Sequence, residues 1–242
     1  MHYETKANQK YLPHIWNGLH KGVLPFGSSL LSLLFEYQER LIRMTVIYSN
    51  FGDQDTELLK GIWEGLEADI IEIKDDDVTV NLQNKDDEEF FPSALVSEAV
   101  EAALDREEDT LIVCGHGTWD GCYAPNYGYT LSYENRDRIK AKRVIGIWCN
   151  AATFAEEYKV PGFFSSMFIS NQAEARYMGI FGEDDDSIQE SERKFTLILN
   201  ALIKENVPME EWCSVFKASI DNNNEVEDYN FSMLKYFPSI KT

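Results

Sequence analysis

The chain has 242 residues, of which 44% are hydrophobic and 26% are charged. This length suits one principal domain with a sizeable core, and the composition excludes a wholly disordered or fibrous chain. The sequence holds 42 Asp and Glu against 22 Lys and Arg, so its net charge is −20. A surface this negative repels nucleic-acid backbones and anionic membrane leaflets. We therefore expect neither a nucleic acid nor a membrane as a partner.

Residues 1–43 differ in charge from the rest of the chain. They hold five Lys and Arg against three Asp and Glu, whereas residues 44–242 hold 17 against 39. Two interpretations stay open for this segment: an extension translated from upstream, or an ordinary N-terminal helix that docks on the domain. Residues 44–242 are expected to form the domain itself.

No targeting or membrane-spanning pattern stands out in the sequence. The apolar run over residues 23–35 is too short to cross a bilayer and lacks the features of a secretory signal. The cysteines are sparse and contain no C-x-x-C pair, which favours a reducing cytoplasm over a disulfide framework. We expect a cytoplasmic protein with four free thiols: Cys114, Cys122, Cys149 and Cys213.

Strand patterns alternate with helix patterns along the chain. Five runs are predicted as strands: residues 44–50, 69–74, 110–114, 143–148 and 176–181. Helical spacing or small-residue content predicts helices over residues 58–66, 92–104, 133–141, 151–158, 163–171, 191–204 and 209–220. Residues 75–89 are expected to form an acidic loop with a short hairpin strand at 78–82, and residues 119–129 another loop.

This alternation predicts an α/β fold. We expect a mainly parallel, doubly wound sheet of about five to six strands flanked by helices, with a helical C-terminal part. No internal repeat or long low-complexity linker supports a second independent domain.

One histidine and one cysteine stand where ligands gather in such folds. His116 follows the apolar strand 110–114, and Cys149 follows the strand 143–148. If the two strands are neighbours, the imidazole and the thiol share one crevice at the carboxyl edge of the sheet. An imidazole can activate a thiol as a nucleophile. The alternative for each residue alone is ordinary packing, since free cysteine is commonly buried.

The segments around these two residues resemble caspase-like cysteine peptidases of clan CD. Residues 111–118 read Leu-Ile-Val-Cys-Gly-His-Gly-Thr, and residues 144–152 read Val-Ile-Gly-Ile-Trp-Cys-Asn-Ala-Ala, which is most like the CHAT branch. The resemblance implies a caspase-like domain, His116 as general base and Cys149 as nucleophile. It also implies an oxyanion hole made by the backbone amides of Gly117 and Cys149.

Two positions depart from that family pattern. Many members carry a small residue before the cysteine and an acidic residue two positions before it, where this chain has Trp148 and Ile147. Ile147 gives no basis for predicting an Arg or Lys preference, and Trp148 is expected to turn into the core. Both departures leave open a binding fold that no longer cleaves peptides.

Other motifs carry weaker expectations. The acidic runs 75–77, 86–89 and 183–186 suggest calcium, but none has EF-hand spacing, so solvated loops are favoured and no cofactor is required. Trp119, Asp120 and Tyr123 follow His116 and could contact a peptide, or simply form a surface loop. Cys114 is expected to be a buried hydrophobic residue, and Cys213 to pack within a helix.

Two functions are carried forward. The first is a cysteine endopeptidase that cleaves a protein or peptide through the His116 and Cys149 dyad and an acyl-enzyme. The second is a catalytically inactive caspase-like module whose acidic surface binds a basic protein partner.

Overall fold

The computed structural model describes residues 43–74, 98–125, 128–221 and 223–239. Residues 1–42 lie outside the described residues, as do the expected hairpin strand at 78–82 and the acidic runs 75–77 and 86–89. No helix within the described ranges is long and apolar enough to cross a membrane.

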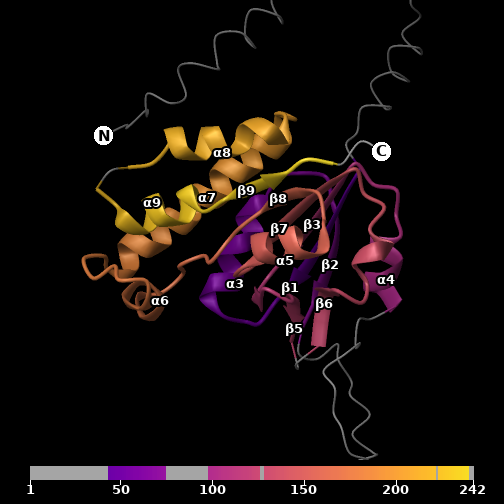
Figure 1. The fold of residues 1–242 in the computed structure, drawn as a ribbon, viewed down its shortest axis with the longest axis horizontal. Helices are drawn as coiled ribbons and strands as arrows, with labels where there is room; N and C mark the ends of the chain where they lie inside the picture. Colours follow the sequence, from indigo (N-terminus) through magenta and orange to yellow (C-terminus); the bar gives the residue numbers. More distant parts are fainter. Residues whose placement is uncertain (1–42, 75–97, 126–127, 222, 240–242) are drawn as a thin grey trace, which may run out of the picture. The chain divides into compact units, whose positions relative to one another are not determined.

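A six-stranded sheet runs through the centre of the domain in the order β2-β1-β3-β7-β8-β9 (Figure 1). Neighbouring strands pair in parallel, except that β9 is antiparallel to β8. The predicted α/β fold with a mainly parallel sheet is thus confirmed. The strands are β1 (Met44–Ser49), β2 (Asp69–Ile73), β3 (Thr110–Cys114), β7 (Arg143–Ile147), β8 (Gly162–Phe164) and β9 (Lys235–Phe237).

Both faces of the sheet are covered. In β1, Val46 and Tyr48 join one apolar cluster while Ile47 joins the other, as the two-residue period of a strand requires. The helices α7 (Asp185–Lys204), α8 (Met209–Ala218) and α9 (Glu225–Ser232) supply the first cluster. The helices α4 (Glu98–Leu104) and α5 (Ala151–Tyr158) pack into the second (Figure 1). Burial on two faces explains why the central strands are almost continuously apolar.

Residues 119–129, predicted as a loop, belong largely to a second, antiparallel sheet. It contains β4 (Gly117–Thr118), β5 (Gly121–Ala124) and β6 (Gly128–Ser132). Cys122, Ala124 and Leu131 are buried in the second core cluster, and this burial stabilises a hairpin despite the turn-rich composition. The helix expected at 133–141 is only the single 3-10 turn η4 (Arg136–Arg138).

The segment 162–181 has the reverse of the predicted order of strand and helix. Instead of a helix over 163–171, Gly162–Phe164 forms β8, and instead of a strand near 176–181, α6 spans Gln172–Tyr177. Phe163 and Phe164 are both fully buried, one in each core cluster, which favours a strand. The Asn171 side chain accepts a hydrogen bond from the Glu174 amide at 3.0 Å and so begins α6.

Most of the remaining helical predictions correspond to helices. For the helix expected at 92–104, α4 covers residues 98–104, and residues 92–97 lie outside the described residues. The helix expected at 58–66 lies earlier in the chain than predicted, as α3 (Gln54–Leu58) followed by the 3-10 turn η2 (Leu59–Ile62). The predictions at 151–158, 191–204 and 209–220 correspond to α5, α7 and α8, although α7 begins six residues earlier than expected. Asp184 starts it by accepting a hydrogen bond from the Ser187 amide at 2.9 Å. The sequence patterns did not predict α9 and β9.

Candidate active site

His116 and Cys149 lie at the same edge of the sheet. Their strands, β3 and β7, are parallel neighbours in which Cys114 pairs with Ile147. This confirms the prediction that the two strands are adjacent. His116 and Cys149 both line one small pocket of about 40 Å³, which we call the dyad pocket. Its other lining residues are Asp55, Thr56, Leu59, Gly115, Ile147, Trp148, Phe168, Ser170 and Glu192.

An aspartate that the motif analysis missed holds the histidine. Nε2 of His116 lies 2.7 Å from Oδ2 of Asp53. The other oxygen of Asp53, Oδ1, accepts hydrogen bonds from the amide and hydroxyl of Thr56, at 2.8 and 2.9 Å. Burial raises the pKa of Asp53, but the bonds from Thr56 and His116 outweigh it and keep the pKa below its ordinary value. Asp53 is therefore a carboxylate at neutral pH that fixes the orientation of the imidazole.

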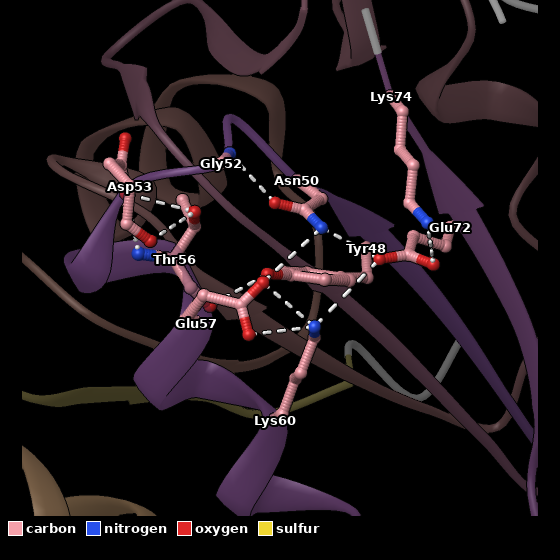
Figure 2. A network of polar contacts seen from close by, with 9 residues as sticks. All are labelled: Tyr48, Asn50, Gly52, Asp53, Thr56, Glu57, Lys60, Glu72 and Lys74. Atoms are coloured by element: carbon pink, nitrogen blue, oxygen red, sulfur yellow. Dashed lines mark hydrogen bonds and ion pairs between the residues drawn. The ribbon is translucent and has the colours of Figure 1, made fainter. Parts of the chain in front are cut away.

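The turn after β1 places Asp53 beside His116. Figure 2 shows this turn, where the Gly52 amide donates to Oδ1 of Asn50 at 2.8 Å and Nδ2 of Asn50 donates to Glu72 of β2 at 2.7 Å. Gly52 has a φ of 71°, a backbone conformation that glycine adopts without strain. Asp53 then begins α3 as its N-cap, so one carboxylate both starts the helix and holds the histidine.

Cys149 sits in a tight turn between β7 and α5. The next residue, Asn150, has a left-handed backbone with a φ of 64°. Buried Ser165 fastens the turn, because its hydroxyl accepts from the Trp148 amide at 3.1 Å and donates to the Trp148 carbonyl at 2.8 Å. The Asn150 amide donates to the Ser166 carbonyl at 3.0 Å. The cysteine backbone is thus anchored on both sides by the segment that follows β8.

The thiol of Cys149 is protonated at neutral pH. Burial raises its pKa to about 11, and the charges of Glu174 and Asp55 act in the same direction. Sγ donates to the carbonyl of Phe168 at 3.6 Å. Reactivity as a nucleophile would therefore need a base that removes the thiol proton.

The tryptophan that precedes Cys149 points into the core, as expected. Trp148 is 2% exposed, and its Nε1 donates to the Thr118 carbonyl at 3.0 Å. A Cβ atom on Gly117 would lie 2.3 Å from Cδ1 of this indole, so only glycine fits there. Trp148 therefore links the His116 loop to the Cys149 turn.

The structure gives the backbone amides proposed for an oxyanion hole few other partners. The Tyr123 amide donates to the His116 carbonyl at 2.8 Å. Gly117 and Cys122 consequently form a non-hydrogen-bonded pair of the antiparallel ladder, and the Gly117 amide points away from β5. The Cys149 amide donates no hydrogen bond to any residue in the described ranges. Both amides are therefore candidates to bind a developing oxyanion.

The residues expected to contact a peptide form a separate polar group. Asp120 accepts hydrogen bonds from Tyr129 and Thr118, and the Tyr123 hydroxyl donates to Thr118 at 3.1 Å. Trp119 is 53% exposed. Trp119, Asp120 and Tyr123 do not line the dyad pocket, although the Tyr123 amide donates to the His116 carbonyl.

No metal site emerges from the residues that the structure describes. No group of three or more His, Cys, Asp or Glu there is arranged to hold a metal ion. In the acidic run 183–186, Asp184 caps α7, and Glu183 accepts from the Glu225 amide at 2.8 Å. All four cysteines are free thiols. Cys114 is fully buried, as expected, and Sγ of Cys213 in α8 donates to the Leu234 carbonyl at 3.5 Å.

Comparisons of the chain with models of known protein families and with curated proteins found no match. The caspase-like resemblance of residues 111–118 and 144–152 therefore stays a prediction from the sequence. The candidate active site is defined by its own geometry: a carboxylate, an imidazole and a thiol at adjoining strand ends.

Proposed function

We propose that this protein is a cysteine endopeptidase in which His116 activates Cys149. The observation that carries the proposal is that both residues line one pocket, with Oδ2 of Asp53 lying 2.7 Å from Nε2 of the imidazole. A cysteine and a histidine with separate structural roles would rarely line the same pocket at the carboxyl edge of a parallel sheet, which is where the active sites of α/β folds lie.

The orientation of His116 defines its role in the reaction. Since Nε2 is bonded to Asp53, Nδ1 is the ring nitrogen that would accept the Cys149 proton. The thiol now donates to the Phe168 carbonyl, so it must leave this acceptor before its proton can pass to the imidazole. The raised pKa of Cys149 agrees with general-base activation when substrate binds and disagrees with a resting thiolate.

The reaction would proceed by acyl transfer. Sγ attacks the peptide carbonyl carbon as its proton passes to His116, and the amides of Gly117 and Cys149 bind the oxyanion. His116 then protonates the departing amine as the carbon–nitrogen bond breaks, leaving a thioester. Water, deprotonated by His116, attacks the thioester carbonyl, the carbon–sulfur bond breaks, and the proton returns to Sγ.

A labelling experiment tests this function. The full chain is incubated under reducing conditions with peptidyl acyloxymethyl ketones that differ in leading residue, and adducts are located by mass spectrometry. We expect modification at Cys149 that is lost in His116→Ala. Cys213→Ala serves as the matched control, since it removes another partly exposed thiol and should leave labelling unchanged. Equal labelling with and without the His116 imidazole would contradict the proposed dyad.

A binding module without catalysis is the second candidate. The observation in its favour is the resting state of Cys149, whose pKa burial raises to about 11. The net charge of −20 favours a basic protein as partner. This candidate predicts that Cys149→Ala captures the same partner as the native chain and that the native chain leaves that partner uncleaved. We also propose that the protein acts in a reducing compartment such as the cytoplasm, which suits its free thiols.

A further inference from the structure

A buried carboxyl group forms part of the wall of the dyad pocket. Glu192 of α7 lines the pocket together with Cys149 and is only 5% exposed. Among the described residues, no hydrogen-bond donor or acceptor contacts its Oε2 atom. Leaving a buried carboxyl oxygen unpaired costs free energy, so such an atom in a native structure calls for an explanation. A ligand that enters the pocket and donates to this oxygen would remove the cost.

Two more carboxyl groups lie beside Ser170, which lines the same pocket together with Asp55. The hydroxyl of Ser170 lies 2.7 Å from Oδ2 of Asp55 and 3.1 Å from Oε2 of Glu174. A hydroxyl has one proton and can donate to only one of these oxygens at a time. Oε2 of Glu174 also accepts from the Ser170 amide at 2.9 Å. The Asp55 carboxylate, which itself lines the pocket, has no other hydrogen bond within the described ranges and keeps acceptor capacity.

No cationic side chain neutralises this group of acids. Within the described ranges, neither Asp55, Glu174 nor Glu192 forms an ion pair with Lys, Arg or His. Arg193, next to Glu192 in the chain, instead pairs with Glu190 at 3.5 Å on the exposed side of α7. The pocket beside the thiol is consequently short of positive charge.

Part of the remaining wall of the pocket is apolar. Leu59, Ile147 and Phe168 contribute it. Apolar walls beside carboxyl groups suit a ligand with an aliphatic stem and a cationic head, which is the chemistry of Lys and Arg side chains.

We propose that the dyad pocket binds the Lys or Arg side chain of the substrate residue whose carbonyl Cys149 attacks, with Glu192 as the principal acceptor and Asp55 as a second one. This proposal rests on the proposed peptidase function. Glu192 and Asp55 come from α7 and α3, so specificity would be set by elements outside the two strand-end segments that supply the dyad.

The test compares matched electrophiles on matched variants. Cys149 labelling rates are measured with acyloxymethyl ketones that carry Lys, Arg or norleucine as leading residue, norleucine being an uncharged analogue of Lys. We expect the basic probes to react faster than the norleucine probe with the native chain. In Glu192→Gln, which keeps the size of the side chain, the rate with the basic probes should fall by about ten- to a hundred-fold relative to the rate with the norleucine probe, the usual effect of losing a charge-assisted bond. Glu190→Gln, on the exposed side of the same helix, should change neither rate.

A binding measurement separates this proposal from the proposed function. Nα-acetyl-lysine amide and its norleucine analogue are titrated by calorimetry into Cys149→Ala, with and without Glu192→Gln. If no probe labels Cys149 but the lysine ligand binds in a Glu192-dependent manner, the proposed peptidase function fails. The dyad pocket would then still be a binding site for a basic side chain. Labelling with no preference for basic probes, or a lysine ligand that binds no better than norleucine, would overturn the pocket proposal. Calcium alone binding in a Glu192-dependent manner would overturn it as well.

Discussion

Replacing Glu192 by Gln should change how the stability of the protein depends on pH. Burial, with the charges of Asp55 and Glu174, raises the pKa of Glu192 from 4.5 to about 9. Because the folded-state pKa is raised, the stabilising effect of the bound proton is complete below pH 4.5 and is lost as the pH rises toward 9. With the dyad pocket empty, keeping this carboxyl protonated costs the native chain about 3 kcal/mol at pH 7 but less than about 1 kcal/mol at pH 5. A cationic side chain in the pocket would favour release of that proton and pair with the carboxylate.

Gln has similar size and does not titrate, so the variant avoids this penalty. Between pH 5 and pH 7 the free energy of unfolding of Glu192→Gln should rise relative to the native chain by about 2.5 kcal/mol. Urea unfolding at pH 5, 6, 7 and 8 measures this difference, and Glu190→Gln on the exposed side of α7 is the control. If the native chain and Glu192→Gln show parallel pH dependence, Glu192 ionises normally in the folded state and the reasoning is refuted.

Three further substitutions test the geometry of the site. Asp53→Asn keeps a side chain that caps α3 but presents an amide N–H to Nε2 of His116, which moves the ring proton to Nδ1. Labelling of Cys149 should therefore slow by about 100-fold or more, with little change in the stability of the protein. An unchanged labelling rate would exclude Asp53 as the group that orients the imidazole. Ser165→Ala leaves the buried amide and carbonyl of Trp148 without their partner. The free energy of unfolding, measured by urea titration, should fall by about 2 kcal/mol. A loss near zero would refute the role of Ser165 in the turn. Gly117→Ala forces a methyl group against Trp148. The free energy of unfolding should fall by about 1–3 kcal/mol, and the tryptophan fluorescence should change. A native emission spectrum together with native stability would show that the surrounding side chains make room for the methyl group at no cost.

Burial pattern explains which parts of the fold were predictable from the sequence. The strands β1, β3 and β7 are covered on both faces and so read as continuous apolar runs. By contrast β8 has only three residues, too few to reveal a period, and its flanking small residues favoured a helix in the prediction. The run 176–181 is apolar in sequence, yet Tyr177 and Phe181 are highly exposed, so apolar character there does not mark a buried strand.

The candidate site was predictable in its centre and not at its periphery. His116 and Cys149 were identified because each follows a buried strand of the same sheet. Asp53 was overlooked because an aspartate after Gly52 before a helix is fully explained as an N-cap. Glu192 carried a usable signal: it falls on the buried stripe of α7 with Ile188, Phe195 and Leu199, where an acidic residue is unusual.

Cys149 depends on the far end of the chain for its surroundings. The segment that follows β8 fastens the cysteine turn through Ser165 and supplies Phe168 to the dyad pocket. That segment is itself held from α9, since buried Asn230 accepts from the Ile169 amide at 2.8 Å and donates to the Ile169 carbonyl at 3.0 Å. Residues some eighty positions after the thiol thus complete its environment. A chain released prematurely during synthesis, before α9, would contain the whole dyad yet lack its support, so reactivity should arise only once translation has passed Asn230.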